Sequence, residues 1–258
     1  MVIDRKKTIM STNMSWSCAL LSAKAARWAY YDSAEAKPKF KTLGFKTHRF
    51  LDKDGAQVHL CNNDDTALIA CRGTEPKELN DLIADLNTIP KRHGPGFVHS
   101  GFRGEARKIW NSVHAFAKKH KDKEIIVCGH SLGAAMATYI AQELRWHDIE
   151  NVTLYTFGSP KLGNGSYVDA MDVPHWRFVN NNDVVCKVPP SLIGFRHHGE
   201  LKYINYYGNI RKVTRWQRIK DQLRGRWRAL RKFQLFDGAF DHSMDLYLDK
   251  TEKAEKQK

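Results

Sequence analysis

The chain has 258 residues, of which 42% are hydrophobic and 11% aromatic, so we expect a sizeable core and exclude wholesale disorder. Its 42 lysines and arginines exceed its 28 aspartates and glutamates, which gives a formal net charge of +14 and favours association with anionic surfaces. No apolar run approaches the roughly 18–20 residues of a membrane-spanning helix, and we predict no signal peptide.

The cysteine content indicates a reducing compartment. The number of cysteines is odd, and they show neither C-x-x-C spacing nor the density of a disulfide scaffold. They are Cys18, Cys61, Cys71, Cys128 and Cys186. We therefore expect free thiols and a cytoplasmic location.

Along the chain, short apolar runs alternate with helical patterns. Residues 1–14 carry no periodicity and are predicted to be a flexible arm, and a helix is predicted over 15–31. Further helices are predicted over 104–120 and 134–145. The strand-like runs are Phe45–Leu51, Val58–Cys61, Thr66–Cys71, Ile125–Cys128, Val152–Phe157, Trp176–Val179 and Leu201–Tyr206. This alternation predicts an α/β fold with a mostly parallel central sheet and helices on both faces, with antiparallel hairpins among the first three runs.

The domain organisation follows from the same pattern. We expect one domain over residues 15–249, with a basic insertion at 208–236 and a charged tail at 250–258. The insertion contains ten basic residues and one acidic residue, a surplus of nine positive charges. Its apolar residues recur every three or four positions, which predicts one stripe of an amphipathic helix over Trp216–Leu230.

A nucleophile is predicted at Ser131. The run 129–133 has the pattern G-x-S-x-G, preceded by a buried-strand run and followed by an alanine-rich helix former. This is the strand–turn–helix setting of a nucleophile elbow. We expect Ser131 to be exposed at the N-terminus of the helix, where the helix dipole favours developing negative charge.

Several motifs accompany this serine. They are G-H-S-L-G-A-A at 129–135, T-F-G-S-P-K-L-G-N at 156–164, C-R-G-T at 71–74, V-H-S-G-F at 98–102, N-N-N-D-V-V at 180–185 with Pro189 and Pro190, and D-H at 241–242. Together these motifs resemble the class 3 (fungal-lipase-like) lipase family of α/β-hydrolases. They occur in the order of the family and cover about residues 20–248, apart from the insertion. The resemblance implies an α/β-hydrolase fold and a Ser-His-Asp triad.

The acid of the triad is predicted to be Asp183. In the α/β-hydrolase order the acid and the base follow the serine. Asp183 comes shortly after the apolar run that ends at Val179, in a loop where the acid is expected. Asp169 and Asp172 are weaker alternatives because they precede that run.

The general base is predicted to be His242. Three histidines follow Asp183, and His242 lies in the segment D-H-S-M-D-L-Y-L, which resembles the family's catalytic histidine segment. His197 and His198 are the alternatives, although His198-Gly199 matches a family motif with a structural role.

An oxyanion hole needs two N–H donors, each of which contributes on the order of 3 kcal/mol to lowering the barrier. One is predicted to be the amide of Leu132, directly after the nucleophile. By resemblance, the second is the amide of Thr74.

In lipases of this family the segment after the oxyanion threonine forms a mobile lid. Here residues 75–91 carry apolar residues at helical spacing, a pattern that also fits a fixed surface helix, so both interpretations stay open. Glu78, Asp81 and Asp85 make the segment more polar than an interfacial lid requires, which argues against long-chain triglyceride activity.

The basic stripe over Trp216–Leu230 has three interpretations. Tryptophans opposite arginines fit a helix lying in an anionic membrane surface. A helix packed on the domain and a contact with nucleic acid are the others, although no nucleic-acid-binding module is recognisable.

The motifs predict a serine hydrolase that cleaves carboxylic esters of lipids through an acyl-serine intermediate. The alternatives are a soluble short-chain esterase and a catalytically silent membrane- or nucleic-acid-binding protein on a hydrolase scaffold. Acyl transfer would use the same machinery. No cofactor or metal is predicted, since no histidine or cysteine cluster has ligand spacing.

Overall fold

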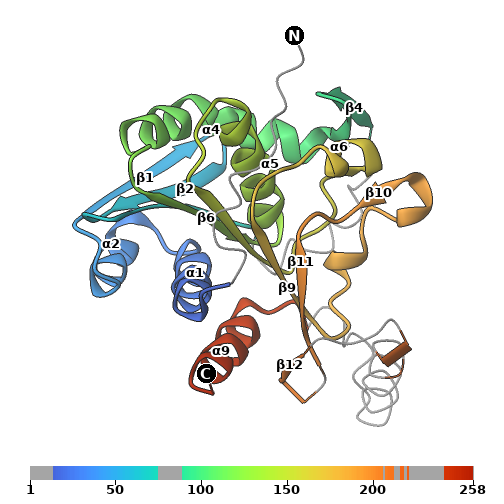
Figure 1. The fold of residues 1–258 in the computed structure, drawn as a ribbon. Helices are drawn as coiled ribbons and strands as arrows, with labels where there is room; N and C mark the ends of the chain where they lie inside the picture. The colour runs from blue at the N-terminus through green and yellow to red at the C-terminus, as the bar shows by residue number, and fades with distance from the viewer. Residues whose placement is uncertain are drawn as a thin grey trace.

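The computed structural model describes residues 14–74, 89–205, 207–211, 216–217, 220 and 241–257. Within these ranges eight strands form a central sheet in the order β1-β2-β3-β6-β7-β9-β11-β12 (Figure 1). Their bounds are β1 Thr47–Lys53, β2 Ala56–Asn62, β3 Thr66–Cys71, β6 Glu124–His130, β7 Val152–Phe157, β9 His175–Asn180, β11 Glu200–Ile204 and β12 Ile210–Arg211.

The sheet has the predicted mixture of parallel and antiparallel pairs. Five consecutive strands of the sheet are parallel to one another: β3, β6, β7, β9 and β11. At one edge, β2 pairs antiparallel with both β1 and β3. The α/β class and the antiparallel edge are therefore confirmed. Because the parallel strands all end at one edge, the loops that follow β6, β7 and β9 meet there.

Helices cover both faces of the sheet (Figure 1). One face is covered by α4 (Ser100–Lys119) and α5 (Leu132–Trp146), and the other by α1 (Trp16–Trp28), α2 (Ser33–Thr42) and α9 (Met244–Glu255). Helix α1 packs against α9, and Arg27 of α1 donates a hydrogen bond to Asp245 of α9. The first and last described helices therefore support each other.

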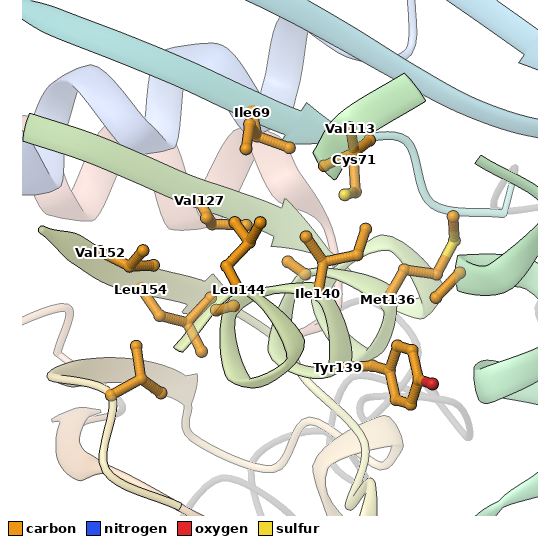
Figure 2. Close-up of a cluster of buried hydrophobic side chains, with 14 of the residues drawn as sticks. Ile69, Cys71, Val113, Val127, Met136, Tyr139, Ile140, Leu144, Val152 and Leu154 are labelled. Carbon is orange, nitrogen blue, oxygen red and sulfur yellow. The ribbon is translucent and has the colours of Figure 1, made fainter. Parts of the chain in front are cut away.

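The core follows from the alternation of side chains along the strands. In β6, Val127 points toward α5, whereas Ile126 and Cys128 point toward α1. Figure 2 shows Val127 among the side chains of α5, including Ile140 and Leu144. Strands that are buried on both faces have near-continuous apolar sequences, which is why periodicity and run length located them.

A second, antiparallel sheet of short strands has the order β10-β8-β5-β4. Its strands are β4 (Pro90–His93), β5 (Gly96–His99), β8 (Gly163–Asn164) and β10 (Phe195–Arg196), with the short helix α6 (Gly165–Asp169) beside it. The sequence did not predict this sheet, because strands of two to four residues leave no periodic signal. Two single 3₁₀ turns, η2 (Val185–Lys187) and η3 (Ser191–Ile193), precede β10.

The predicted charged tail at 250–258 is wrong in its first part. Helix α9 continues to Glu255, and its buried face includes Met244, Tyr247 and Thr251. Spacings of three and four residues place these side chains on one stripe, so the helix packs on the domain despite its many charges. The predicted arm at 1–14 and the insertion at 208–236 lie largely outside the described residues. Nowhere in the described ranges is there a helix long and apolar enough to cross a membrane.

Candidate active site

The turn between β6 and α5 holds Ser131 in a strained backbone conformation. Its φ is 58° and its ψ is −130°, a combination that residues with a Cβ rarely adopt. The N–H of Ser131 donates to the carbonyl oxygen of Phe157 at the end of β7, at 3.1 Å. This bond ties the turn to the neighbouring strand, as expected for a nucleophile elbow at the carboxyl edge of the sheet.

The two glycines of the G-x-S-x-G pattern are required by close backbone approaches. A Cβ on Gly129 would lie 2.3 Å from the carbonyl oxygen of Gly133. A Cβ on Gly133 would lie 2.4 Å from the carbonyl oxygen of Cys71, the last residue of β3. Helix α5 therefore begins directly against the end of β3, which only glycine at these positions permits.

The side chain of Ser131 is buried, although the sequence predicted it to be exposed. Its relative exposure is 0%, and its Oγ has no hydrogen-bond partner among the described residues. The backbone of Gly73 packs against it, since a Cβ there would lie 3.3 Å from the Cβ of Ser131. The half-buried Thr74 follows Gly73, and Leu132 opens α5. The two predicted oxyanion residues are therefore sequence neighbours of the site: Thr74 follows Gly73, which packs against Ser131, and Leu132 follows Ser131 itself.

Asp183 and His242 form a buried pair, although 59 positions separate them in the sequence. The Nδ1 atom of His242 lies 2.9 Å from Oδ2 and 3.0 Å from Oδ1 of Asp183. Because a carboxylate only accepts hydrogen bonds, Nδ1 carries the proton and Nε2 keeps a lone pair. Burial acts to raise the pKa of Asp183, but His242 and a bond from Tyr247 outweigh it and hold that pKa below its usual value.

The pair and the serine turn meet at the end of β7. Gly158 has a φ of +59°, and a Cβ there would lie 2.8 Å from both Oδ2 of Asp183 and Cε1 of His242. The preceding carbonyl, that of Phe157, accepts the N–H of Ser131. One peptide unit therefore contacts both halves of the site. The Nε2 of His242 is buried without a hydrogen-bond partner among the described residues, as is the Oγ of Ser131.

Tyr247 is a site residue that the sequence analysis missed. Its hydroxyl donates to Oδ2 of Asp183 at 2.6 Å and accepts the backbone N–H of Asn180 at 2.9 Å. It projects from the buried stripe of α9, five residues after His242. The helical spacing of Met244, Tyr247 and Thr251 is the signal that could have indicated a buried tyrosine there.

Asp241 links the loop of the acid to the loop of the base. Its carboxylate accepts hydrogen bonds from the side chains of Asn180 and Asn181, at 3.3 Å and 3.2 Å, and from the backbone N–H of Asn182 at 3.0 Å. The three asparagines, which could be taken for turn residues alone, therefore hold the residue next to His242. This joins the end of β9 to the start of α9.

The alternative candidates lie in other contacts. His197 contacts the carbonyl oxygen of Cys186 at 2.8 Å, and His198 contacts the ring of His175 at 3.2 Å. Asp172 forms an ion pair with Arg145, and Asp169 lies 3.5 Å from Arg196. The structure therefore pairs Asp183 with His242, with the turn of Ser131 joined to them through the Phe157–Gly158 peptide, and places the alternatives in other contacts.

Two predictions concern residues outside the described ranges. The segment 75–91 is described only from Ile89 onward, so the choice between a lid and a fixed helix stays a prediction. Of the stripe over Trp216–Leu230, only Trp216, Gln217 and Lys220 are described; they are helical and exposed. Across the described part of the chain, no group of three or more potential ligands is arranged to hold a metal ion.

Comparison with known proteins gives consistent matches. The family model described as lipase (class 3) matches residues 68–193. A lipase from Rhizomucor miehei is 32% identical over 163 residues, which are 58% of this chain and 44% of the relative. A secreted mono- and diacylglycerol lipase from Malassezia restricta is 31% identical over 141 residues, 49% of this chain and 47% of the relative. The chain thus spans about half the length of these relatives.

Solved structures show the same likeness over a larger share of the chain. A triacylglycerol lipase whose catalytic centre is a serine protease triad superposes with a TM-score of 0.63 and 26% identity. The superposition covers 73% of this chain and 78% of that structure. The fold therefore has a solved counterpart.

Proposed function

Because the chain belongs to the class 3 lipase family of α/β-hydrolases, we propose that it hydrolyses carboxylic esters of lipids. The main support for this proposal is the buried Asp183–His242 pair beside a serine in a strand-to-helix turn. The open lone pair on Nε2 of His242 is the atom that a general base needs.

In the proposed reaction, Oγ of Ser131 attacks the ester carbonyl carbon while Nε2 of His242 takes its proton. The N–H groups of Leu132 and Thr74 stabilise the negative charge on the carbonyl oxygen. His242 then gives the proton to the departing alkoxide, which leaves as an alcohol. A water molecule, deprotonated by His242, then attacks the acyl-serine; the bond from the acyl carbon to Oγ breaks, His242 returns the proton to Oγ of Ser131, and the carboxylic acid leaves. Asp183 keeps the imidazole oriented and stabilises its cationic form.

A series of p-nitrophenyl esters of increasing chain length tests this proposal. The wild type should turn over these esters, and Ser131→Ala should lower kcat by about 10⁵-fold or more, as loss of a serine nucleophile does in other triads. Ser112→Ala, a serine on α4, is the matched control and should keep full activity. Absence of ester turnover by the wild type in aqueous and vesicle assays would contradict hydrolysis and favour a binding role.

We also propose that the enzyme acts at an anionic lipid surface, rather than on soluble short-chain esters. Trp216 is 64% exposed, with the ammonium of Lys220 5.5 Å from its ring centre. Leu192 is 97% exposed and Ile193 57% exposed in η3, which follows the loop of Asp183. Exposed apolar side chains together with a net charge of +14 suit an anionic bilayer.

Vesicle sedimentation tests the lipid-surface proposal separately from catalysis. Ser131→Ala should bind vesicles that contain anionic lipid more tightly than neutral vesicles, and salt should weaken the binding. Leu192→Asp should weaken binding to these vesicles. Asp169→Asn, a change at another exposed side chain, is the control and should leave binding unchanged. Equal affinity for neutral and anionic vesicles, with activity confined to acetate or butyrate esters, would favour a soluble esterase.

We propose a reducing compartment, such as the cytoplasm, as the place of action. All five cysteines are free, and four of them are buried. Burial raises the pKa of Cys71 to about 12, so that thiol is protonated and unreactive. A relative from Malassezia restricta is described as secreted, so cell fractionation decides between the two locations. Recovery of the chain from the medium rather than the cell would contradict the proposal.

A further inference from the structure

His130, the residue before Ser131, is packed against the ring of His242. The ring centres are 4.4 Å apart and the planes are inclined by 29°, which is a stacked arrangement. The rings of Tyr247 and His130 pack in an edge-on arrangement, with their centres 5.8 Å apart. His130 is 4% exposed and is therefore buried in the site. The proposed reaction gives it no role.

Two hydrogen bonds fix which nitrogen of His130 carries the proton. Its Nε2 lies 2.7 Å from the backbone carbonyl oxygen of His242, and a carbonyl oxygen only accepts, so Nε2 is the protonated nitrogen. Its Nδ1 therefore accepts the hydroxyl proton of Tyr30, at 2.8 Å. Burial, together with the nearby His242, lowers the pKa of His130 to about 3, so the ring is neutral at ordinary pH.

We propose that His130 is a positioning residue that holds the imidazole of His242 from its face and through its backbone. This inference rests on the proposed hydrolase function. Asp183 holds the edge of that imidazole at Nδ1, and His130 restrains its face and the carbonyl of the same residue. Nε2 is then the one ring nitrogen of His242 left for Ser131, in a fixed direction.

The neutrality of His130 is part of this role. During catalysis the imidazole of His242 becomes an imidazolium cation when it takes the proton of Ser131. A charged residue stacked on it would repel that cation, whereas the π face of a neutral ring attracts it. The hydroxyl of Tyr30, by occupying Nδ1, supports the neutral tautomer that donates to the His242 carbonyl.

Three substitutions separate the two contacts of His130. His130→Phe keeps a ring against His242 but removes the N–H donor, His130→Gln keeps a donor without a ring, and His130→Ala removes both. We expect His130→Ala to lower kcat about 100-fold with KM within about twofold, because misplacement of a base by about 1 Å has that effect. Each single-contact variant should recover about tenfold of this loss. His114→Gln on α4 is the matched histidine control and should behave like the wild type.

The inference is overturned if His130→Phe and His130→Gln both keep kcat within about twofold of the wild type, whether or not His130→Ala folds. A loss in only one of them supports it and identifies the contact that matters: the carbonyl bond for Phe, the ring face for Gln. Thermal unfolding of each variant must show an intact domain at the assay temperature.

A measurement without substrate separates this inference from the proposed function. The proton on Nδ1 of His242 that bonds to Asp183 should give a downfield NMR resonance in the wild type. It should broaden or shift in the His130 variants and stay in place in His114→Gln. If the wild type hydrolyses no ester, the function fails, and this resonance still decides whether His130 positions His242. An unchanged resonance in all three folded variants would contradict the positioning role.

Discussion

The two halves of the candidate site are held by different means. The turn of Ser131 is fixed by backbone packing, with Gly129 and Gly133 set against neighbouring carbonyl oxygens and no hydrogen bond to the serine hydroxyl from the residues that the structure describes. The Asp183–His242 pair is fixed by hydrogen bonds to the carboxylate, which accepts from His242, from the hydroxyl of Tyr247 and from the backbone N–H of Val185. We therefore expect added atoms to disrupt the first half and the removal of hydrogen-bonding groups to disrupt the second.

Among changes to the groups that hold the serine and the histidine in place, the largest effect should come from the hydrogen-bonded half. Asp183→Asn keeps the shape of the side chain but favours the wrong tautomer of His242, so kcat should fall about 10⁴-fold. Asp169→Asn, an exposed carboxylate near Arg196, is the matched control and should keep kcat within about twofold. Steady-state kinetics on a p-nitrophenyl ester measure both. A loss below about tenfold in Asp183→Asn would show that Asp183 does not orient His242.

Next comes the packed half, which a single methyl group should disrupt. In Gly133→Ala the new Cβ meets the Cys71 carbonyl, so α5 must move away from β3 and the N–H donors of the oxyanion hole separate. Loss of one donor costs about 3 kcal/mol, so kcat should fall roughly 100- to 1,000-fold. Gly104→Ala, in open space on α4, should instead raise the melting temperature slightly because alanine favours helix. Equal behaviour of the two variants would contradict the packing argument.

The junction between the halves should show a smaller loss. In Gly158→Ala the Cβ presses on the side chains of Asp183 and His242, which can shift by a few tenths of an ångström, and we expect kcat to fall by about 100-fold at most. Gly55→Ala has a similar positive φ, 84°, but no atom within 4 Å of the new Cβ. It should lose stability from backbone strain alone and keep its kcat, as measured by parallel kinetics and thermal unfolding.

The smallest effect should come from Tyr247→Phe. Loss of this donor weakens the forces that lower the pKa of Asp183, and we expect a loss of about 1–3 kcal/mol in the free energy of unfolding near neutral pH. Because the folded-state pKa of Asp183 is lowered, its contribution to stability is present above the unfolded pKa of about 3.9 and is lost as the pH falls through the folded value.

Denaturant unfolding over a range of pH checks this sign. The difference between the wild type and Tyr247→Phe should be largest above about pH 4 and should shrink toward lower pH, since Asp183 becomes protonated in both proteins. A difference that grows as the pH falls would show that the hydroxyl of Tyr247 does not act through the ionised carboxylate.

The sequence predicted the parts of the molecule whose physical signals are local. The apolar runs Thr66–Cys71 and Val152–Phe157 coincide with β3 and β7, because strands buried on both faces must be continuously apolar. The turn of Ser131 was predictable because its two glycines leave a pattern in five residues. The pairing of Asp183 with His242 followed from motif order and the family resemblance.

The remaining parts depend on contacts that no local pattern encodes. Helix α2 contains Pro38, which lacks an N–H and ordinarily indicates a helix break. The helix forms nevertheless, because Asp32 caps its start and Ala36 and Phe40 are buried against the domain. The tail after 249 looks solvated because its charges outnumber the apolar residues that pack. Tyr247 and Asp241 act on residues about 60 positions away, so their roles become visible only when β9 and α9 are side by side.

The packing of α1 against α9 has a consequence for how the chain becomes active during synthesis. Strands β1 to β11 and the serine turn can leave the ribosome and pair before residues 241–257 exist, but His242 belongs to that last described segment. Helix α1, the first described helix, can pack on the sheet earlier, but the part of it that faces α9 stays uncovered until this segment is made. A nascent or prematurely terminated polypeptide that ends before this segment would therefore lack the proposed base, and we expect it to be inert toward esters in the cell that makes it.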